Sequence, residues 1–196
     1  QGYDSKVLSY RAKMLSDIPE NASRQFIIRI YLMDNTTSIF EYASRNTGFK
    51  QCLFQKRMQV ALPNQEIYSS EKPRYFEPHH FYIGAQLNLG GFKFYITSAD
   101  EYTLRYMELH CDKFSRANAS LIMEKIRAGL KPHYTQFINE YTPVREMNGT
   151  LVINYDKFRE ATVKYLGDAI VEHEIITVAR RYAIRRNDER NTREYL

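Results

Sequence analysis

Hydrophobic and polar residues alternate along much of the first hundred positions, which is the pattern of β-strands with one buried face. In residues 7–14 the alternation puts Leu8, Tyr10, Ala12 and Met14 on one side. The same period, or a run rich in β-branched and aromatic residues, recurs in 25–33, 37–43, 51–60, 85–89 and 92–96. Several short strands at this spacing predict a small barrel or sandwich.

Turn-forming residues separate these strands. Asp34-Asn35-Thr36-Thr37 joins two of them, and Gly90-Gly91 joins two more. Asp, Asn and Gly accept the left-handed backbone that tight hairpins need, so both segments predict hairpin turns. We expect residues 16–23 to form a loop, and residues 63–80 to form a long connection broken by prolines.

The period changes to that of helices at residue 100. Residues 100–109 predict a helix that closes one mouth of the barrel. We predict further helices at 117–128, ended by Gly129, around Phe137-Ile138, at 156–166 and at 170–184. The fold class is therefore α+β in sequence order, with a β domain at 1–112 and an α domain at 113–196 that we take to be truncated.

Composition agrees with a folded chain. Of the 196 residues, 43% are hydrophobic and 26% are charged, which is close to the average of globular domains. The sequence contains no apolar run of the roughly 20 residues that a membrane helix needs. It begins with Gln1 and has no leader, so we interpret it as a fragment. Cys52 and Cys111 lie far apart, and we expect buried, unpaired thiols in a reducing compartment.

The net charge of +5 is concentrated near the end of the chain. The basic residues there are Arg180, Arg181, Arg185, Arg186, Arg190 and Arg193. Such an end can meet nucleic acid, anionic lipid or an acidic protein surface, or it can be an ordinary solvated helix face. The first four of these arginines are our candidate partner contacts.

No catalytic arrangement stands out in the sequence. It has no nucleophile elbow, Walker loop or dinucleotide-binding glycine motif, and Gly90-Gly91 belongs to a hairpin. Side chains of His79 and His80 would point apart on an extended chain, and His173 has acidic neighbours at a spacing unsuited to shared metal binding. We therefore expect no enzyme activity and no cofactor.

One segment has the form of an ion-binding loop. Residues 146–157 precede a helix in the way that an EF-hand loop does, with Glu146, Asn148 and Thr150 at alternate positions. A calcium loop requires Gly at its sixth position and a bidentate Glu at its twelfth. Here these are Leu151 and Lys157, and an ammonium group repels Ca²⁺. We predict a degenerate EF-like loop that binds no calcium.

Four ordered motifs resemble the DM-ten domain. They are the hairpin at 26–36, the Phe-Tyr-Ile-Gly segment at 81–84, the glycine hairpin at 90–91 and Asp-Glu-Tyr-Thr-Leu-Arg-Tyr at 100–106. With the helices that follow, the chain is similar to the C-terminal part of the ciliary EF-hand-domain-containing proteins of the ribbon-compartment or myoclonin type. Asn35 replaces an Asp of the family pattern, and residues 51–57 also depart from it, which puts one strand edge in doubt.

The resemblance implies a small pleckstrin-homology-like barrel closed by a helix, followed by an EF-hand-like helical region. It also implies a non-enzymatic microtubule inner protein, with the cytoskeleton of the ciliary axoneme as its location. The implied partners are tubulin in the lumen of the doublet and other inner proteins, with no nucleic acid and no membrane. Two alternatives stay open: a membrane or phosphoinositide adaptor, and a calcium-responsive regulator.

Overall fold

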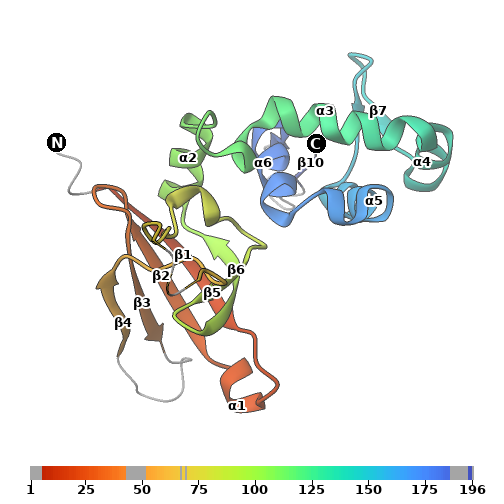
Figure 1. Cartoon of the computed structure of the whole chain (residues 1–196). Coiled ribbons are helices and arrows are strands. Elements are labelled where there is room, and N and C mark those ends of the chain that lie inside the picture. Colours follow the sequence, from red (N-terminus) through yellow and green to blue (C-terminus); the bar gives the residue numbers. More distant parts are fainter. Residues whose placement is uncertain (1–5, 43–51, 67, 69, 186–193, 196) are drawn as a thin grey trace. The chain divides into compact units, whose positions relative to one another are not determined.

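The computed structural model describes residues 6–42, 52–66, 68, 70–185 and 194–195. The chain forms two compact units, residues 1–107 and 108–196. The first is a curled β-sheet and the second is built mainly of helices (Figure 1). The predicted order, a β region followed by an α region, is confirmed.

The first unit contains one antiparallel sheet with strand order β4-β3-β2-β1-β6-β5. Its strands are β1 (Val7–Met14), β2 (Gln25–Tyr31), β3 (Thr36–Tyr42), β4 (Cys52–Met58), β5 (Gln86–Leu89) and β6 (Phe92–Ala99). Among the described residues β4 and β5 are the edges of this sheet, so it is a half-barrel and not the closed barrel of the sequence interpretation. A one-turn helix, α1 (Pro19–Ala22), lies within the segment that we expected to be a loop.

The predicted alternation sets the register of the sheet. Tyr10 lies opposite Ile28 and Ala12 opposite Phe26, so inward-facing residues meet across neighbouring strands and exclude water. Phe54 comes from the edge strand β4, and its ring centroid lies 5.1 Å from that of Phe92 on β6. The curl thus brings strands near the two opposite edges of the sheet into aromatic contact over a buried core.

Helix α2 (Glu101–Leu109) covers one end of this sheet (Figure 1). The backbone amide of Ser9 donates to Thr103 Oγ1 at 2.8 Å. The buried Tyr10 hydroxyl lies 3.1 Å from the Phe81 carbonyl oxygen and 3.3 Å from Met107 Sδ. These contacts attach the helix to the central strand β1.

Both predicted hairpin tips are turns. Asn35 has φ +55°, and Gly90 has φ +61°, which are the left-handed conformations that these residue types tolerate. Asp34 accepts hydrogen bonds from Thr36 and forms an ion pair with Arg57, in which Nη2 lies 2.7 Å from Oδ2. The Asp34 carboxylate at the polar tip is therefore engaged by the turn and by Arg57.

The second unit packs its helices around a small apolar core. They are α3 (Ala119–Leu130), α4 (Tyr134–Tyr141), α5 (Tyr155–Leu166) and α6 (Glu172–Tyr182), with the short strand pairs β7 (Val144–Arg145), β8 (Leu151–Val152) and β9 (Ile184–Arg185), β10 (Glu194–Tyr195). The core residues are Ile122, Ile126, Phe158, Ile170, Ile175 and Val178. No helix in the described part of the chain is both long enough and apolar enough to cross a bilayer.

Gly129 does not end its helix, contrary to the sequence prediction. Helix α3 continues through it to Leu130. A Cβ at this position would lie only 2.7 Å from Leu166 Cγ. The glycine therefore permits the close approach of α3 and α5, which a helix propensity argument does not reveal.

Candidate functional site

The segment predicted as an ion-binding loop is largely a hairpin. Strands β7 and β8 pair, with Val144 opposite Val152, and residues 146–150 form the tip. The Glu146 amide donates to the Thr150 carbonyl oxygen at 2.9 Å, and Asn148 Oδ1 accepts from the Thr150 amide at 2.9 Å. The Asn148 side-chain oxygen, a ligand in the EF-like register, is thus engaged by the turn itself.

The last position of that register lies beyond the hairpin. Lys157 is exposed in the first turn of α5, which Asn154 caps by accepting from the Asp156 amide at 2.9 Å. Nowhere in the described ranges do three or more His, Cys, Asp or Glu side chains gather as metal ligands would. The absence of calcium binding stays a prediction, and the paired backbone of residues 144–152 supplies a geometric reason for it.

The predicted histidine and cysteine environments need correction. Residues 78–80 form a 3₁₀ turn, so the rings of His79 and His80 lie 4.0 Å apart instead of pointing away from each other. Burial and then the charge of His79 lower the pKa of His80. Cys52 is exposed and Cys111 is half-buried, so the expected burial of the two thiols is wrong.

The four candidate arginines have different environments. Arg180 Nε lies 2.5 Å from Glu108 Oε1, so this guanidinium holds an acidic side chain of its own unit. Arg181 is exposed at the end of α6. Arg185 belongs to β9, and Arg186 lies outside the described residues. Only Arg181 is thus shown as an exposed basic side chain, and its contact with a partner stays a prediction.

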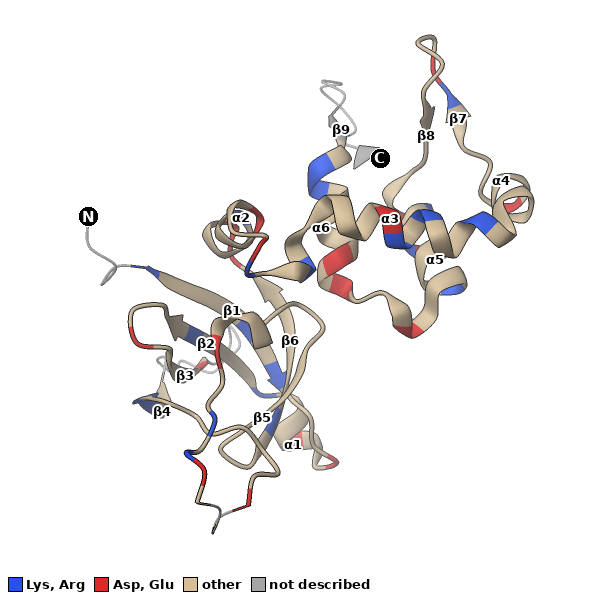
Figure 2. Cartoon of the chain, turned by 45° about the horizontal axis from the view of Figure 1, so that its top comes forward, with Lys and Arg blue, Asp and Glu red and all other residues tan. Residues whose placement is uncertain are grey.

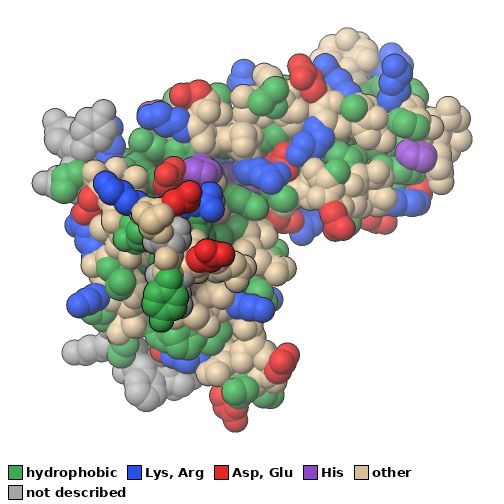
Figure 3. Space-filling view, in the orientation of Figure 1, with side chains coloured by type: hydrophobic (Ala, Val, Ile, Leu, Met, Phe, Trp, Pro, Cys, Tyr) green, Lys and Arg blue, Asp and Glu red, His purple; other side chains and the backbone are tan. Residues whose placement is uncertain are grey.

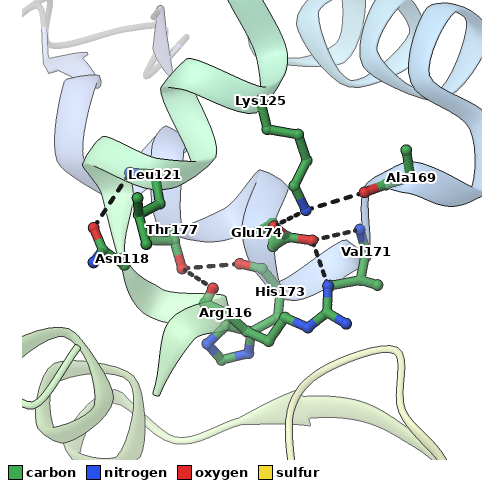
Figure 4. A network of polar contacts seen from close by, with 9 residues as sticks. All are labelled: Arg116, Asn118, Leu121, Lys125, Ala169, Val171, His173, Glu174 and Thr177. Carbon is green, nitrogen blue, oxygen red and sulfur yellow. Dashed lines mark hydrogen bonds and ion pairs between the residues drawn. The ribbon is translucent and has the colours of Figure 1, made fainter. Parts of the chain in front are cut away.

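A buried carboxylate organises the helical unit (Figure 4). Glu174 is 2% exposed, and its oxygens accept from Arg116 Nη1 at 2.9 Å and from Lys125 Nζ at 2.5 Å. It also accepts from the backbone amide of Val171 at 3.1 Å, one of the amides that the start of a helix leaves without a helical partner. Lys125 Nζ donates further to the Ala169 carbonyl oxygen at 3.0 Å. The network ties α6 to α3 and to the turn before it.

His173 lies beside this network and is 1% exposed. Burial lowers its pKa to about 4, and the nearby Arg180 and Arg116 act in the same direction, whereas Glu174 opposes them. Thr177 Oγ1 donates to the His173 carbonyl oxygen at 2.9 Å. The ring is therefore a neutral core group, whose protonation is coupled to the folding of α6.

The role of Glu174 was not predicted. Its place beside His173 indicates only that the two side chains are unsuited to sharing a metal ion. A Glu three residues after the N-cap position, Val171, was the available signal, since an acid there can accept a hydrogen bond from the backbone amide of the N-cap residue. Its basic partners lie more than 45 residues away in sequence, and no local pattern identifies them.

An apolar groove of about 810 Å³ opens on the helical unit. Its lining comes from α3, α4, β8, α5 and α6 and includes Met123, Ile126, Leu130, Phe137, Ile138 and Val152. The charged residues in the lining are Arg127 and Lys131, and both are basic. An open apolar surface with convergent basic groups is suited to an amphipathic segment of another protein that carries acidic residues.

Charge on the surface is mixed. Figure 3 shows Lys and Arg side chains interleaved with Asp and Glu over the visible face of both units. A continuous basic tract, which is the usual footprint of a nucleic-acid-binding domain, is not present on this visible face. The features of the helical unit that bear on binding and stability are the apolar groove and the buried network around Glu174.

Comparison with known proteins identifies the β unit. The DM10 domain family (DM-ten) matches residues 1–103. EF-hand domain-containing family member C2 of Bos taurus is 32% identical over 183 residues, which cover 93% of this chain and 25% of that protein. The protein of the same name from Danio rerio is 35% identical over 191 residues, 97% of this chain and 25% of that protein.

A second group of relatives matches a shorter part of the chain. EF-hand domain-containing protein 1 of Homo sapiens is 35% identical over 124 residues, which cover 63% of this chain and 19% of that protein. The chain thus spans about a quarter or less of the length of the curated relatives it matches.

Proposed function

Because the chain belongs to the DM10-domain family, we propose that it is a structural microtubule inner protein of motile cilia. In this proposal it braces the axonemal doublet from the lumen by binding tubulin and neighbouring inner proteins, without catalysis. The relatives that match most of this chain are named EF-hand domain-containing family member C2. That name and the DM10 domain indicate non-catalytic proteins. The cytoskeletal role and the axonemal location are our inference from the resemblance.

The observation that carries the proposal is the apolar groove of the helical unit. A groove of about 810 Å³ lined by side chains such as Ile138 and Leu151 is costly to leave in water. Leu151 is 41% exposed and Tyr134 is 54% exposed, so both are available to a partner. Arg127 and Lys131 favour an occupant with carboxylates beside its apolar face. We take this occupant to be an amphipathic helix of a neighbouring inner protein.

Binding of this kind stabilises a filament by linkage. A protein that binds only the assembled lattice shifts the assembly equilibrium toward that lattice. Several moderate contacts held on one chain act with high effective concentration, so none of them has to be strong alone. The same proposal includes the finer fold assignment, in which the curled sheet with α2 over one end is pleckstrin-homology-like.

The test is biochemical and structural at once. The tagged chain should stay with salt-washed axonemal doublets and add density on their luminal face. Release with the membrane and matrix fraction would contradict the proposal. Calorimetry with Ca²⁺ and flotation with phosphoinositide vesicles test the two alternatives, and tight binding in either assay would favour that alternative.

The groove has a matched pair of variants. Leu151→Asp places a charge in its lining, whereas Leu121→Asp places the same charge on a leucine that is 54% exposed on α3 and does not line the groove. We expect the first variant to reduce retention on doublets and the second to leave it unchanged. Equal retention of both variants would show that the groove takes no part in binding.

A further inference from the structure

The outward face of the β-sheet is basic and almost free of acidic residues. The six strands contain six Lys or Arg but a single acidic residue, Glu41. Along the sheet strands in Figure 2, Lys and Arg recur, whereas Asp and Glu lie mostly in the connections. Glu41 points to the other face, where Arg24 binds both of its carboxylate oxygens at 2.7 Å. We call the outward cations Arg11, Lys13, Arg29 and Lys93 the basic face.

Three of these cations lie over aromatic rings. Arg29 Cζ is 4.8 Å from the ring centroid of Phe40, Arg11 Cζ is 5.8 Å from that of Tyr42, and Lys13 Nζ is 5.5 Å from that of Tyr95. Cation–π contacts restrain long basic side chains, so less conformational entropy is lost when they bind a partner.

In the described part of the chain, the basic face has no acidic ion-pair partner. Among the ion pairs of the described residues, none includes Arg11, Lys13, Arg29 or Lys93. Arg57 provides the contrast, because Asp34 neutralises it at 2.7 Å. Four positive charges on one sheet face that are not neutralised by ion pairs repel each other and favour the arrival of an acidic surface.

The strand register places the four cations in a row. Ser9 lies opposite Arg29, and Arg11 and Lys13 follow on the same strand β1. The Lys93 carbonyl oxygen accepts from the Leu15 amide at 2.8 Å, which places Lys93 one step further along. Two strand residues span roughly 7 Å, so the row covers roughly 20 Å with one cation at each step.

A hollow of about 390 Å³ lies at one end of the row, between Arg11 and Arg29. A β-bulge shifts the register of β1 and β6 here, and Thr97 Oγ1 donates to the Arg11 carbonyl oxygen at 3.2 Å. Asp100 also borders the hollow, but its Oδ1 accepts from the Thr103 amide at 2.7 Å at the start of α2. The hollow is lined by both arginines and has room for a carboxylate side chain.

We propose that the basic face docks an acidic helix of a partner protein, with one carboxylate seated between Arg11 and Arg29. Acidic residues four positions apart on a helix are separated by about 6 Å along its axis, which matches the step of the row. Residues 1–112 hold 13 Lys or Arg against 12 Asp or Glu. A local basic face on a nearly neutral unit fits a local acidic protein surface better than nucleic acid, which attracts domains that are basic overall.

The identity of the partner rests on the proposed function, in which this helix belongs to tubulin or an inner protein. The docking chemistry itself can be tested without a doublet. The probe is a fluorescent helical peptide with Glu at every fourth position of one face, and binding to the whole chain is measured by anisotropy. A peptide with Lys in place of Glu, a single-stranded RNA and phosphatidylserine vesicles are the comparison ligands.

The test variant is R11E/R29E, and its control is K113E/K157E, which makes the same change in net charge on exposed lysines of the helical unit. We expect R11E/R29E to weaken peptide binding by roughly tenfold or more, since two attractive contacts become repulsive, and the control to stay within about twofold. The variant K13E/K93E, in which both lysines are exposed, gives a second reading if the first variant melts early. Equal affinity of both test variants and the control, or tighter binding of RNA or vesicles than of the acidic peptide, would overturn the inference.

Sedimentation with doublets separates this inference from the proposed function. Loss of peptide binding in R11E/R29E together with no doublet binding by the unmodified chain would leave the docking face correct and the scaffold role wrong. Doublet binding that survives in both basic-face variants, with no affinity for the acidic peptide, would leave the scaffold role correct and the docking face wrong.

Discussion

Replacing Glu174 by Gln should loosen helix α6 more than any other charge-neutralising change in the described helical unit. The side chain keeps its shape, and its remaining oxygen can still accept from the Val171 amide. What is lost is the negative charge that Arg116 Nη1 contacts at 2.9 Å and Lys125 Nζ contacts at 2.5 Å. The start of α6 is then no longer bound electrostatically to α3.

The magnitude follows from the exposure of the three groups. Breaking a buried ion pair typically costs about 3–5 kcal/mol, because a charge is left buried without its partner. Here the carboxylate side chain is 3% exposed, but those of Arg116 and Lys125 are 37% and 35% exposed. The cations therefore recover hydration, and we expect a cost of about 2 kcal/mol, or roughly a 30-fold rise in local opening.

Hydrogen–deuterium exchange resolved by peptide is the assay. Amides of α6 should exchange roughly 30-fold faster in Glu174→Gln, whereas peptides from β1 and β2 serve as the internal reference. Glu172→Gln is the matched control, because Glu172 pairs with the 44% exposed Arg159 near the surface. Such a pair is worth at most about 1 kcal/mol. Equal exchange of α6 in the two variants would refute the reasoning.

Three further predictions concern pH, packing and calcium. Burial lowers the pKa of His173 to about 4, against about 6.5 in the unfolded chain, so the unfolded state takes up a proton first as the pH falls and the folded state loses stability between pH 6.5 and pH 4. Thermal denaturation should show that the free energy of unfolding falls by about 2 kcal/mol between pH 7 and pH 5, and His173→Asn should remove this pH dependence. Gly129→Ala should lower the free energy of unfolding in urea by about 1 kcal/mol, because a Cβ 2.7 Å from Leu166 Cγ overpacks the interface and this cost exceeds the gain in helix propensity. In a Leu166→Ala background the same change should stabilise the chain, and a stabilising effect in both backgrounds would contradict the close approach. Calorimetry should detect no Ca²⁺ binding to the chain either with Lys157 or after Lys157→Glu, because the hairpin, in addition to the ammonium group, prevents the geometry of a calcium-binding loop. Calcium binding gained by this substitution would show that the charge of Lys157 alone was decisive.

Much of the β unit could be predicted because its signal is local. The alternation from Leu8 to Met14 predicts which side chains face inward, and the hairpin at Asn35 and Asp34 follows from turn chemistry. These patterns depend on neighbours two to four residues apart. The extent of closure does not, and the contact of Phe54 with Phe92 depends on how far the whole sheet curls.

The helical unit departs further from the sequence prediction for the same reason. Its helices follow from periodicity, but Gly129 was assigned by local propensity to a helix end, and it lies instead at a helix crossing. The segment 146–157 has the order of residues of an EF-like loop, yet the pairing of Val144 with Val152 makes its first part a hairpin. Pairing between strands of two residues leaves almost no periodic signal.

The sequence by itself determined the order of the two regions, the faces of the strands and the family motifs, because each is carried by residues close together along the chain. Only the tertiary structure decided which charges are used internally and which face outward. Glu174 is satisfied by Arg116 and Lys125 from distant positions, whereas Arg11 and Arg29 lie on adjacent strands and neither takes part in an ion pair of the described residues. Electrostatic pairing acts through space, so equal numbers of acidic and basic residues in a sequence do not reveal where a basic surface remains.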